Sequence, residues 1–353
     1  MMDAVREDVK FNCDVSDAKY WGFFSVCGLL MRLRDLFRSE SNLRPWSTIE
    51  KEKISSWIAA KESAWPALEK EEFRDLSIGG RTFDPFDVSG INTALNEEGL
   101  LYGAGYGLHK KPAFFLADLH SMRRLYDLTV YTGTREHVRD LFASPAMLQG
   151  RCVFLRLETL EEHLWETFLE VKGKKDVYPR DVFSDYGISL DESVDERVFR
   201  RLDDVTSRYS RILQYHELGE SVEDIPGWHD ILAAVSDRTT EYFLRALKDL
   251  IADTSDYGPL RRIIQTHDKG ALALFVSSQE GFRKTLYPEL RTVLDAFFVD
   301  GDWAAVDTVR RQGYERFTAK SREIVELYEG RGLRETVDDA IGDFVRAAAG
   351  LRS

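Results

Sequence analysis

The sequence has few cysteines, and their spacing suits neither a disulfide framework nor a thiolate metal site. Only three occur among 353 residues, and no Cys-x-x-Cys pair is present. An odd count without paired spacing argues against a small secreted fold held together by disulfides. The sequence therefore predicts that Cys13, Cys27 and Cys152 are small buried residues.

The sequence also lacks a hydrophobic run long enough to cross a bilayer, and its N-terminus lacks an apolar leader. The most apolar stretch, residues 20–31, is shorter than the roughly 20 residues that a membrane helix needs. We therefore expect a cytoplasmic protein in which this stretch is a core helix. The helix is expected to begin near Ser16, whose hydroxyl would cap the first turn.

Positive charge is outweighed by negative charge. The chain has 48 Lys and Arg against 61 Asp and Glu, which gives a net charge of −13. Broad attraction to nucleic acid or to an anionic membrane needs clustered excess cations. We therefore expect neither as a partner, and we expect instead a protein partner or a small anionic molecule.

The motifs of the common catalytic classes are absent. No histidine follows a glutamate by three residues, as in di-metal carboxylate bundles. There is no His-Glu-x-x-His motif, no Walker loop and no Gly-x-Ser-x-Gly elbow. Gly103, Gly105 and Gly107 precede no helix and do not have the spacing of the dinucleotide fingerprint. The sequence therefore predicts no cofactor and no resident metal.

Apolar residues recur at helical spacing through most of the chain, which predicts a mainly α protein, a bundle-like assembly of many helices. A small antiparallel β element is expected near residues 100–132, because 113–119 is continuously apolar and 126–131 alternates. Helices are expected at residues 45–73, 88–98, 134–142, 152–171, 178–186, 194–217, 227–253, 257–266, 270–286, 288–299, 302–329 and 333–349.

The polar, proline-containing run at residues 173–180 predicts a linker. It would divide the chain into an N-terminal helical region with a β insert, residues 1–173, and an all-helical region, residues 174–353. One continuous domain is the alternative.

Residues 102–117 join a glycine run to an apolar strand and are the most unusual part of the chain. Glycines let a backbone approach a ligand closely. The candidate catalytic residues, for proton transfer and charge stabilisation on an anionic substrate, are Tyr106, His109, Lys111 and His120. The candidate ligand-binding residues are Arg81, Tyr102, Tyr106, Lys110 and Arg123. The competing interpretation is a hairpin whose lysine-bearing turn keeps a sheet edge soluble.

Histidines next to an acid favour a different hypothesis. A metal-dependent hydrolase would use His216, His229 and His267 as ligands, since each precedes Glu or Asp in a helical context. The alternative is that they are ordinary surface or cap residues. His163 stands one turn before Glu166, and this spacing predicts an ion pair.

Four segments resemble those of an uncharacterised family of bacterial proteins of similar length. They are Asn-Cys-Asp-Val-Ser-Asp-Ala at 12–18, Leu-Arg-Asp-Leu-Phe at 33–37, Pro-Ala-Phe-Phe-Leu-Ala-Asp at 112–118 and Gly-Phe-Arg-Lys-Thr-Leu-Tyr-Pro at 281–288. The resemblance covers most of the chain and implies a cytosolic bacterial protein, without a known activity. The leading hypothesis is therefore a soluble helical protein that binds a partner or a small anion. An enzyme acting on an anionic substrate at residues 102–117 and the metal-dependent hydrolase are the alternatives.

Overall fold

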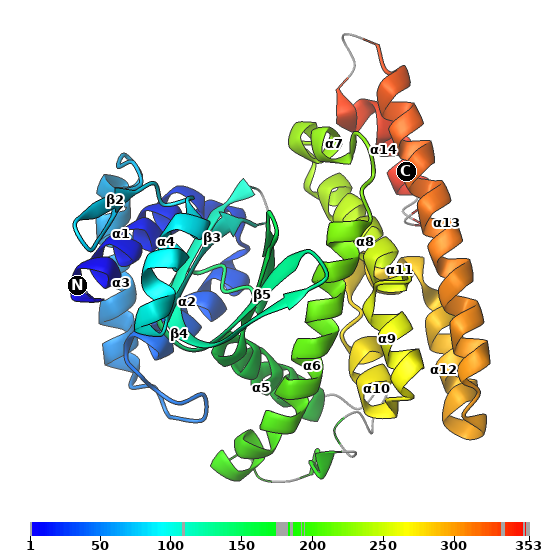
Figure 1. Cartoon of the computed structure of the whole chain (residues 1–353), viewed down its shortest axis with the longest axis horizontal. Coiled ribbons are helices and arrows are strands. Elements are labelled where there is room, and N and C mark those ends of the chain that lie inside the picture. Colours follow the sequence, from blue (N-terminus) through cyan, green and yellow to red (C-terminus); the bar gives the residue numbers. More distant parts are fainter. Residues whose placement is uncertain are drawn as a thin grey trace. The chain divides into compact units, whose positions relative to one another are not determined.

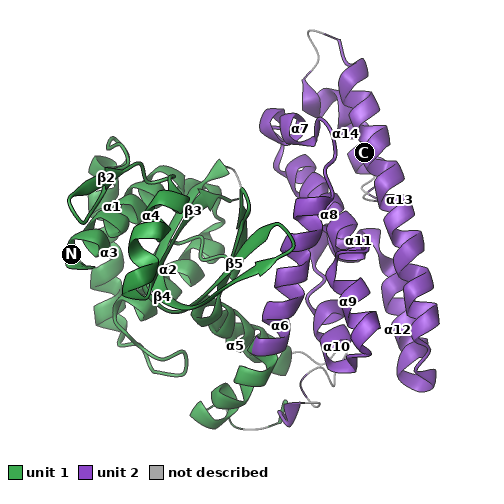
Figure 2. Cartoon of the chain, in the orientation of Figure 1, with its two compact units in different colours: residues 1–173, 190–206 green, residues 174–189, 207–353 purple. Residues whose placement is uncertain are grey.

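The computed structural model describes residues 2–107, 110–173, 183, 186–191, 193, 195–332, 336–348 and 350. The chain divides into two compact units (Figure 2). The first comprises residues 1–173 and 190–206, and the second comprises residues 174–189 and 207–353. Helix α6 (Glu196–Val222) belongs to the first unit up to residue 206 and to the second from residue 207.

The first unit combines helices with a five-stranded mixed sheet (Figure 1). Its other helices are α1 (Met2–Tyr20), η1 (Trp21–Phe23), α2 (Val26–Glu40), α3 (Lys51–Leu68), α4 (Val88–Leu95), η2 (Asn96–Glu98) and α5 (Leu157–Gly173). Its strands are β1 (Leu76–Ile78), β2 (Arg81–Phe83), β3 (Leu100–Tyr106), β4 (Pro112–Leu125), β5 (Leu128–Arg139), β6 (Ala146–Gln149) and β7 (Cys152–Arg156). Strands β1 and β2 pair separately, and the sheet has the order β3-β4-β5-β7-β6.

The prediction of a mainly α, bundle-like protein with a small antiparallel element at residues 100–132 is wrong. The sheet extends from residue 100 to residue 156, and β5 pairs with β7 in parallel, so the fold is a mixture of α and β. Strand β5 continues to Arg139, through residues where a helix was expected, and β7 takes the start of the helix expected at 152–171. A short apolar run such as 152–155 has no periodicity that separates a buried strand from a buried helix.

Both faces of the sheet are buried around β3 and the first half of β4, each in its own apolar cluster. One cluster joins β3 and β4 to α1, α4 and the β1–β2 hairpin, with Val9, Ile91, Tyr102 and Leu116 among its members. The cluster on the other face includes Leu101, Phe115, Tyr131 and Phe154. Consecutive residues of β3 therefore alternate between two cores, as the period of a strand requires.

The glycines of β3 are explained by close packing inside the sheet. A Cβ atom on Gly103 would lie 2.0 Å from the ring of Phe115, its partner on β4. A Cβ atom on Gly105 would lie 2.0 Å from the side chain of Gln149. Gln149 belongs to β6, at the opposite end of the strand order, so Gly105 allows the two outer strands to approach one another.

The apolar stretch at residues 20–31 is not a core helix, contrary to prediction. Helix α1 starts at Met2, and Ser16, the expected cap, is buried inside it and donates a hydrogen bond to the carbonyl of Pro112. A new helix, α2, begins after Ser25, whose side chain accepts from the amide of Gly28. The side chain of Val26 is 76% exposed.

The three cysteines differ in their surroundings. Cys13 is buried, as predicted, and its thiol donates to the carbonyl of Phe114. Cys27 is exposed, so the prediction of a buried residue is wrong, and Cys152 is partly buried. The error for Cys27 has the same origin as the error for the whole stretch, because an apolar run does not reveal which part of it is covered by other elements.

The second unit is helical throughout the residues that the structure describes. After α6 it contains α7 (Trp228–Ala234), α8 (Arg238–Thr254), α9 (Pro259–Thr266), α10 (Lys269–Ser277), α11 (Gly281–Leu286), α12 (Pro288–Asp300), α13 (Trp303–Gly330) and α14 (Val337–Ala348). The helices predicted for this part are confirmed, except that 227–253 and 270–286 are each two helices. The helix expected at 178–186 lies mostly outside the described residues.

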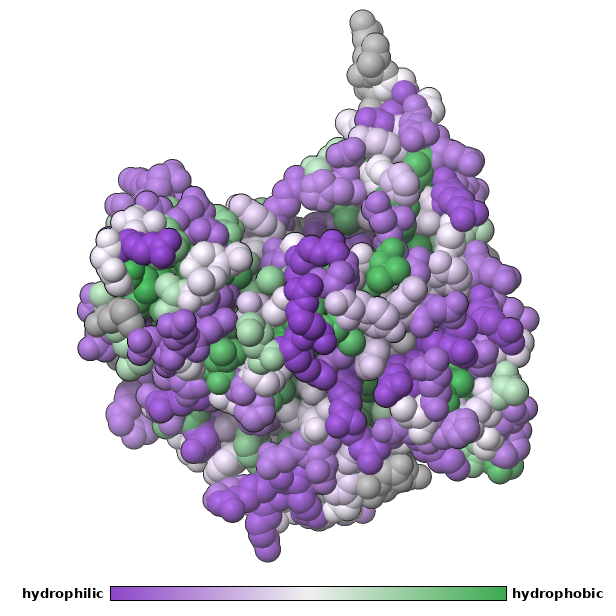
Figure 3. Space-filling view, viewed as in Figure 1, coloured by the Kyte–Doolittle hydropathy of each residue, from purple (hydrophilic) through white to green (hydrophobic). Residues whose placement is uncertain are grey.

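Among the helices of the described residues, none has both the length and the apolar composition of a bilayer span. On the face in Figure 3, hydrophilic residues predominate and apolar residues form small separate patches.

Candidate functional site

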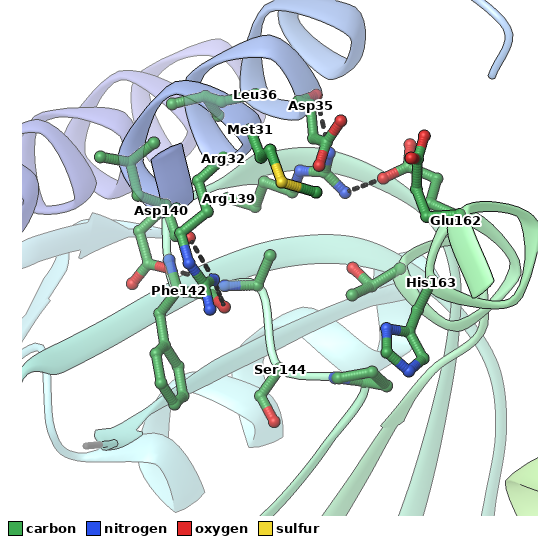
Figure 4. A pocket seen from close by; sticks show the side chains of 16 residues that line it. Met31, Arg32, Asp35, Leu36, Arg139, Asp140, Phe142, Ser144, Glu162 and His163 are labelled. Carbon is green, nitrogen blue, oxygen red and sulfur yellow. Dashed lines mark hydrogen bonds and ion pairs between the residues drawn. The ribbon is translucent and has the colours of Figure 1, made fainter. Parts of the chain in front are cut away.

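A cavity of about 450 Å³ lies in the first unit between α2, α5 and the loop that joins β5 to β6 (Figure 4). This volume is in the range of pockets that hold small organic ligands. Its lining combines apolar side chains, among them Met31 and Phe142, with charged and polar ones, among them Arg32, Asp35 and His163.

The loop that lines the cavity is fixed by a buried carboxylate and a guanidinium. The carboxylate of Asp140 accepts from the amides of Phe142 (2.8 Å) and Ala143 (3.3 Å) and so closes the turn. Arg32 of α2 donates to the carbonyls of Leu141 (2.9 Å) and Phe142 (2.7 Å). These bonds tie the loop to α2, so this wall is preorganised.

Arg139 links the other walls. Its guanidinium, 2% exposed, donates to the carboxylate of Glu162 on α5 (2.6 Å) and to the main-chain carbonyl of Asp35 on α2 (2.8 Å). Burial raises the pKa of Glu162 to about 7, although Arg139 opposes the shift. The imidazole of His163 projects from the same helix as Glu162 (Figure 4). The cavity therefore holds a carboxyl group that titrates near neutral pH.

Carboxylates outnumber guanidinium groups on the lining. Asp35, Asp140, Glu162 and Glu166 are the acids, and Arg32 and Arg139 are the fixed cations. Glu166 forms an ion pair with Arg34 (3.0 Å), a partner that the spacing from His163 did not indicate. Arg32 and Arg139 bond to protein oxygens, and the four acids pair with Arg34, Lys111 and Arg139. The excess of carboxylate oxygens on the lining therefore favours a neutral or cationic ligand over an anionic one.

The buried members of the set predicted at residues 102–117 have structural partners. Tyr102 is fully buried, and its hydroxyl donates to the carbonyl of Pro85 (2.8 Å). Lys111 is also buried and forms ion pairs with Asp17 (3.0 Å) and Asp140 (3.3 Å). Burial lowers the pKa of Lys111, but these carboxylates outweigh it and the net shift is upward.

The other predicted site residues lie on the surface. Tyr106 is 59% exposed and its ring stacks on Phe86, with centroids 5.0 Å apart. Four further candidates are exposed: Arg81, Lys110, His120 and Arg123. His109 lies outside the described residues. None of the predicted site residues that the structure describes lies on the lining of the cavity between α2 and α5. The predicted residues also differ widely in burial, from fully buried to exposed.

The residues that do line the cavity were missed as a site. The sequence suggested no role for Arg32 and Asp35, and it placed Arg139 and Asp140 within a helix expected at 134–142. The available signal was the density of charge in an otherwise apolar context at residues 136–140, Glu-His-Val-Arg-Asp. Charged residues that are buried must be paired, so such a segment indicates a buried ionic network.

A second cluster of ionisable groups lies in the second unit, on α6 and α8. One ring nitrogen of His216 and one oxygen each from Glu220 and Asp249 lie within 4.8 Å of one another. Asp253 accepts from Nδ1 of His216 (2.8 Å) and also from Arg283 (2.5 Å). Burial lowers the pKa of His216, but Asp253 and the other carboxylates outweigh it and raise the value to about 10.

Of the three histidines predicted as metal ligands, His216 is the one in this cluster. His229 is exposed on α7. His267 ends α9 in a left-handed conformation, and its ring stacks on Trp303 with centroids 5.4 Å apart. The partners of His216 are therefore carboxylates rather than the two other histidines.

Comparison with family models gives two matches that together cover most of the chain. Residues 4–156 match the N-terminal domain of a family of unknown function, DUF6866, and residues 161–347 match the C-terminal domain of the same family. No curated protein matches the chain, and no solved structure matches it.

Proposed function

Because the chain belongs to DUF6866, a family of unknown function, we propose a role from its own geometry: the first unit binds a small polar molecule, neutral or cationic. The observation that carries the proposal is the cavity of about 450 Å³ between α2, α5 and the β5–β6 loop. It joins apolar surface, from Met31 and Phe142, to a few oriented polar groups, which is the usual composition of a ligand site.

The walls support binding because hydrogen bonds within the protein already hold them. Arg32 fixes the loop, and Arg139 fixes α5 against α2. A ligand would therefore not have to order these elements, a cost that otherwise weakens binding.

The accessible charge supports the ligand class. The side chain of Asp35 is 34% exposed and that of Glu162 is 20% exposed, whereas that of Arg139 is 2% exposed. Carboxylate oxygens accept hydrogen bonds from ammonium or hydroxyl groups. This cavity is thus better suited to an amine or a polyol than to the anionic ligand expected from the sequence.

A ligand screen with charge-neutralising variants tests the proposal. Thermal unfolding of the full chain would be measured against a panel of amines, polyols and organic acids. We expect stabilisation by amines or polyols that is lost in both Asp35→Asn and Glu162→Gln. Glu52→Gln, at an exposed acid of α3, is the matched control and should retain it. The proposal would be overturned if only organic acids stabilised the protein, or if no compound did. It would also be overturned if amines or polyols stabilised both variants as much as they stabilise wild type.

Catalysis at the same cavity is a second candidate function, favoured by one observation. Glu162, with a pKa of about 7, sits next to His163, and a group that titrates near the working pH is suited to general acid–base chemistry. Turnover of a compound that binds would then be lost in Glu162→Gln while binding of the compound persists. Turnover that is unchanged in this variant would exclude the role.

We also propose that the protein works in the cytoplasm. The proposal is supported by its cysteines, all of which are free thiols. Alkylation of the native protein from its own cells, followed by mass spectrometry, should find the exposed Cys27 reduced. A disulfide at Cys27 would contradict the proposal.

A further inference from the structure

The cluster on α6 and α8 presents three donor atoms of the kind that hold metal ions. His216 and Glu220 are one helical turn apart, so they project from the same side of α6, and Asp249 faces them from α8. The two helices approach closely here, because a Cβ atom on Gly219 would lie 2.5 Å from the carbonyl oxygen of Ala252. Donor atoms bound to one ion at about 2.0–2.2 Å stand roughly 3–3.5 Å apart. A spacing within 4.8 Å therefore needs only a small inward rotation of the carboxylates.

The imidazole of His216 is held in the orientation that a metal ligand requires. Its Nδ1 donates to Asp253, whose side chain is 1% exposed and is itself fixed by Arg283. Its Nε2 lies 3.9 Å from Oε1 of Glu220, on the side of the remaining donors. A buried carboxylate behind a histidine is the arrangement that sets the tautomer and the ring orientation in many metal sites.

Acidic side chains outnumber the fixed cations around these donors. Lys248 and Arg283 are the cations, and Glu217, Glu220, Asp249 and Asp253 are the acids. Such oxygen-rich surroundings can accommodate a divalent ion beside a neutral His216.

Glu217 is a further acid at the edge of the cluster. It is 7% exposed, and no hydrogen bond or ion pair joins its carboxyl to another described residue. The nearby charges that act on it most strongly are those of Glu220 and His216, so it borders the same three donors. The positive charges that act on Glu217 are those of His216 and Lys248, and an ion beside Glu220 would add a further one.

We propose that His216, Glu220 and Asp249 bind one divalent transition-metal ion, Zn²⁺ or Mn²⁺. An imidazole together with carboxylates suits these ions better than Ca²⁺ or Mg²⁺, which take oxygen ligands. The three side chains are 16%, 17% and 28% exposed, so water reaches the donors. Three protein ligands leave further coordination positions open, as in sites where the ion acts on a bound molecule.

Metal titration of the full chain tests the proposal. Protein stripped with a chelator would be titrated calorimetrically with Zn²⁺ and, separately, with Mn²⁺, and bound metal would be counted by elemental analysis. We expect one ion per chain and a higher melting temperature for the loaded protein. Glu220→Gln and Asp249→Asn should each weaken binding by at least about tenfold, the loss that removal of even a supporting group causes.

Two control variants separate this site from surface binding. His229→Gln and Asp295→Asn change an exposed histidine and an exposed acid of the same unit, and should leave the affinity unchanged. In the competing arrangement no metal binds, and a protonated His216 forms the ion pairs with the surrounding carboxylates. Folded wild-type protein that takes up neither ion would establish that arrangement and overturn the proposal. Equal affinity in Glu220→Gln, Asp249→Asn and wild type would overturn it as well. If a variant fails to fold, the wild-type titration still decides.

Discussion

Arg156 and Glu136 form a two-pronged ion pair in the interior of the first unit. Nε and Nη2 of Arg156 donate to the two carboxylate oxygens of Glu136 at 3.0 and 2.5 Å. Both side chains are at most 1% exposed, and the hydroxyl of Thr159 donates to the same carboxylate at 2.5 Å. The pair joins the two parallel strands, β5 and β7, to the first turn of α5. Arg156 thereby holds the pKa of Glu136 below its ordinary value, although burial acts in the opposite direction.

Breaking this pair should be costly. Arg156→Met leaves the Glu136 carboxylate buried without its partner, and we expect the free energy of unfolding to fall by about 3–5 kcal/mol. Urea denaturation would measure it. Lys53→Met, which breaks an exposed pair with Glu50, is the control and should change stability by less than about 0.5 kcal/mol. Similar small effects in both variants would show that the buried pair is not a structural link.

The stability of the first unit should fall as Glu162 ionises. The pKa of this group is raised from 4.5 to about 7 in the folded protein, so the folded state holds the proton more tightly than the unfolded one. Its contribution is therefore most favourable below pH 4.5 and is lost as the pH rises to about 7. Urea denaturation at pH 5 and pH 8 should show a larger loss for wild type than for Glu162→Gln, by up to about 3 kcal/mol. Equal losses of unfolding free energy in wild type and Glu162→Gln would contradict the raised pKa of Glu162.

The bond between His216 and Asp253 should also make stability fall as the pH rises, although His216 is a base and Glu162 is an acid. In metal-free protein the pKa of His216 is raised from 6.5 to about 10, so its contribution is complete below pH 6.5 and is lost as the pH rises through 10. With chelator present, wild type should lose more stability between pH 7 and pH 10 than His216→Gln. Parallel curves for the two proteins would contradict the ion pair.

The outer edge of the sheet should depend on one side-chain amide. Asn92 of α4 donates to the carbonyl of Tyr102 (2.7 Å) and accepts from its amide (2.9 Å), which pairs the free side of edge strand β3. Asn92→Ala would leave two buried backbone groups unbonded and should cost about 2–5 kcal/mol by urea denaturation. Thr93→Ala, at the exposed neighbouring position, serves as control. A loss for Asn92→Ala no greater than that of the control would mean that water replaces the amide.

Local signals predicted much of the fold. The helical segment expected at residues 88–98 ends at Gly99, which adopts a left-handed conformation with φ of 74°. The apolar run at 113–119 is part of β4, and the helices of the second unit follow their apolar periodicity. These elements are determined by residues close together in sequence, so a single sequence contains enough information for them.

The parallel pair and the cavity could not be predicted in this way. β5 and β7 pair in parallel although β6 lies between them in the sequence. No short sequence pattern specifies which strands pair. Arg32, Arg139 and Glu162 come from three distant segments, and each alone resembles an ordinary surface charge. The glycine run was interpreted as a ligand site for a related reason. Gly105 is required by the close approach of Gln149, which is a neighbour in space but not in sequence.

The ion pair of Lys111 with Asp17 has a consequence for synthesis. Asp17 also accepts from the amide of Leu141, which is 124 positions further along the chain. At about 5–20 residues per second, the ribosome adds that length in roughly 6–25 s. Helix α1 thus leaves the ribosome many seconds before the groups that bond to Asp17. During that interval a chaperone that recognises nascent chains would find the apolar side of α1 uncovered.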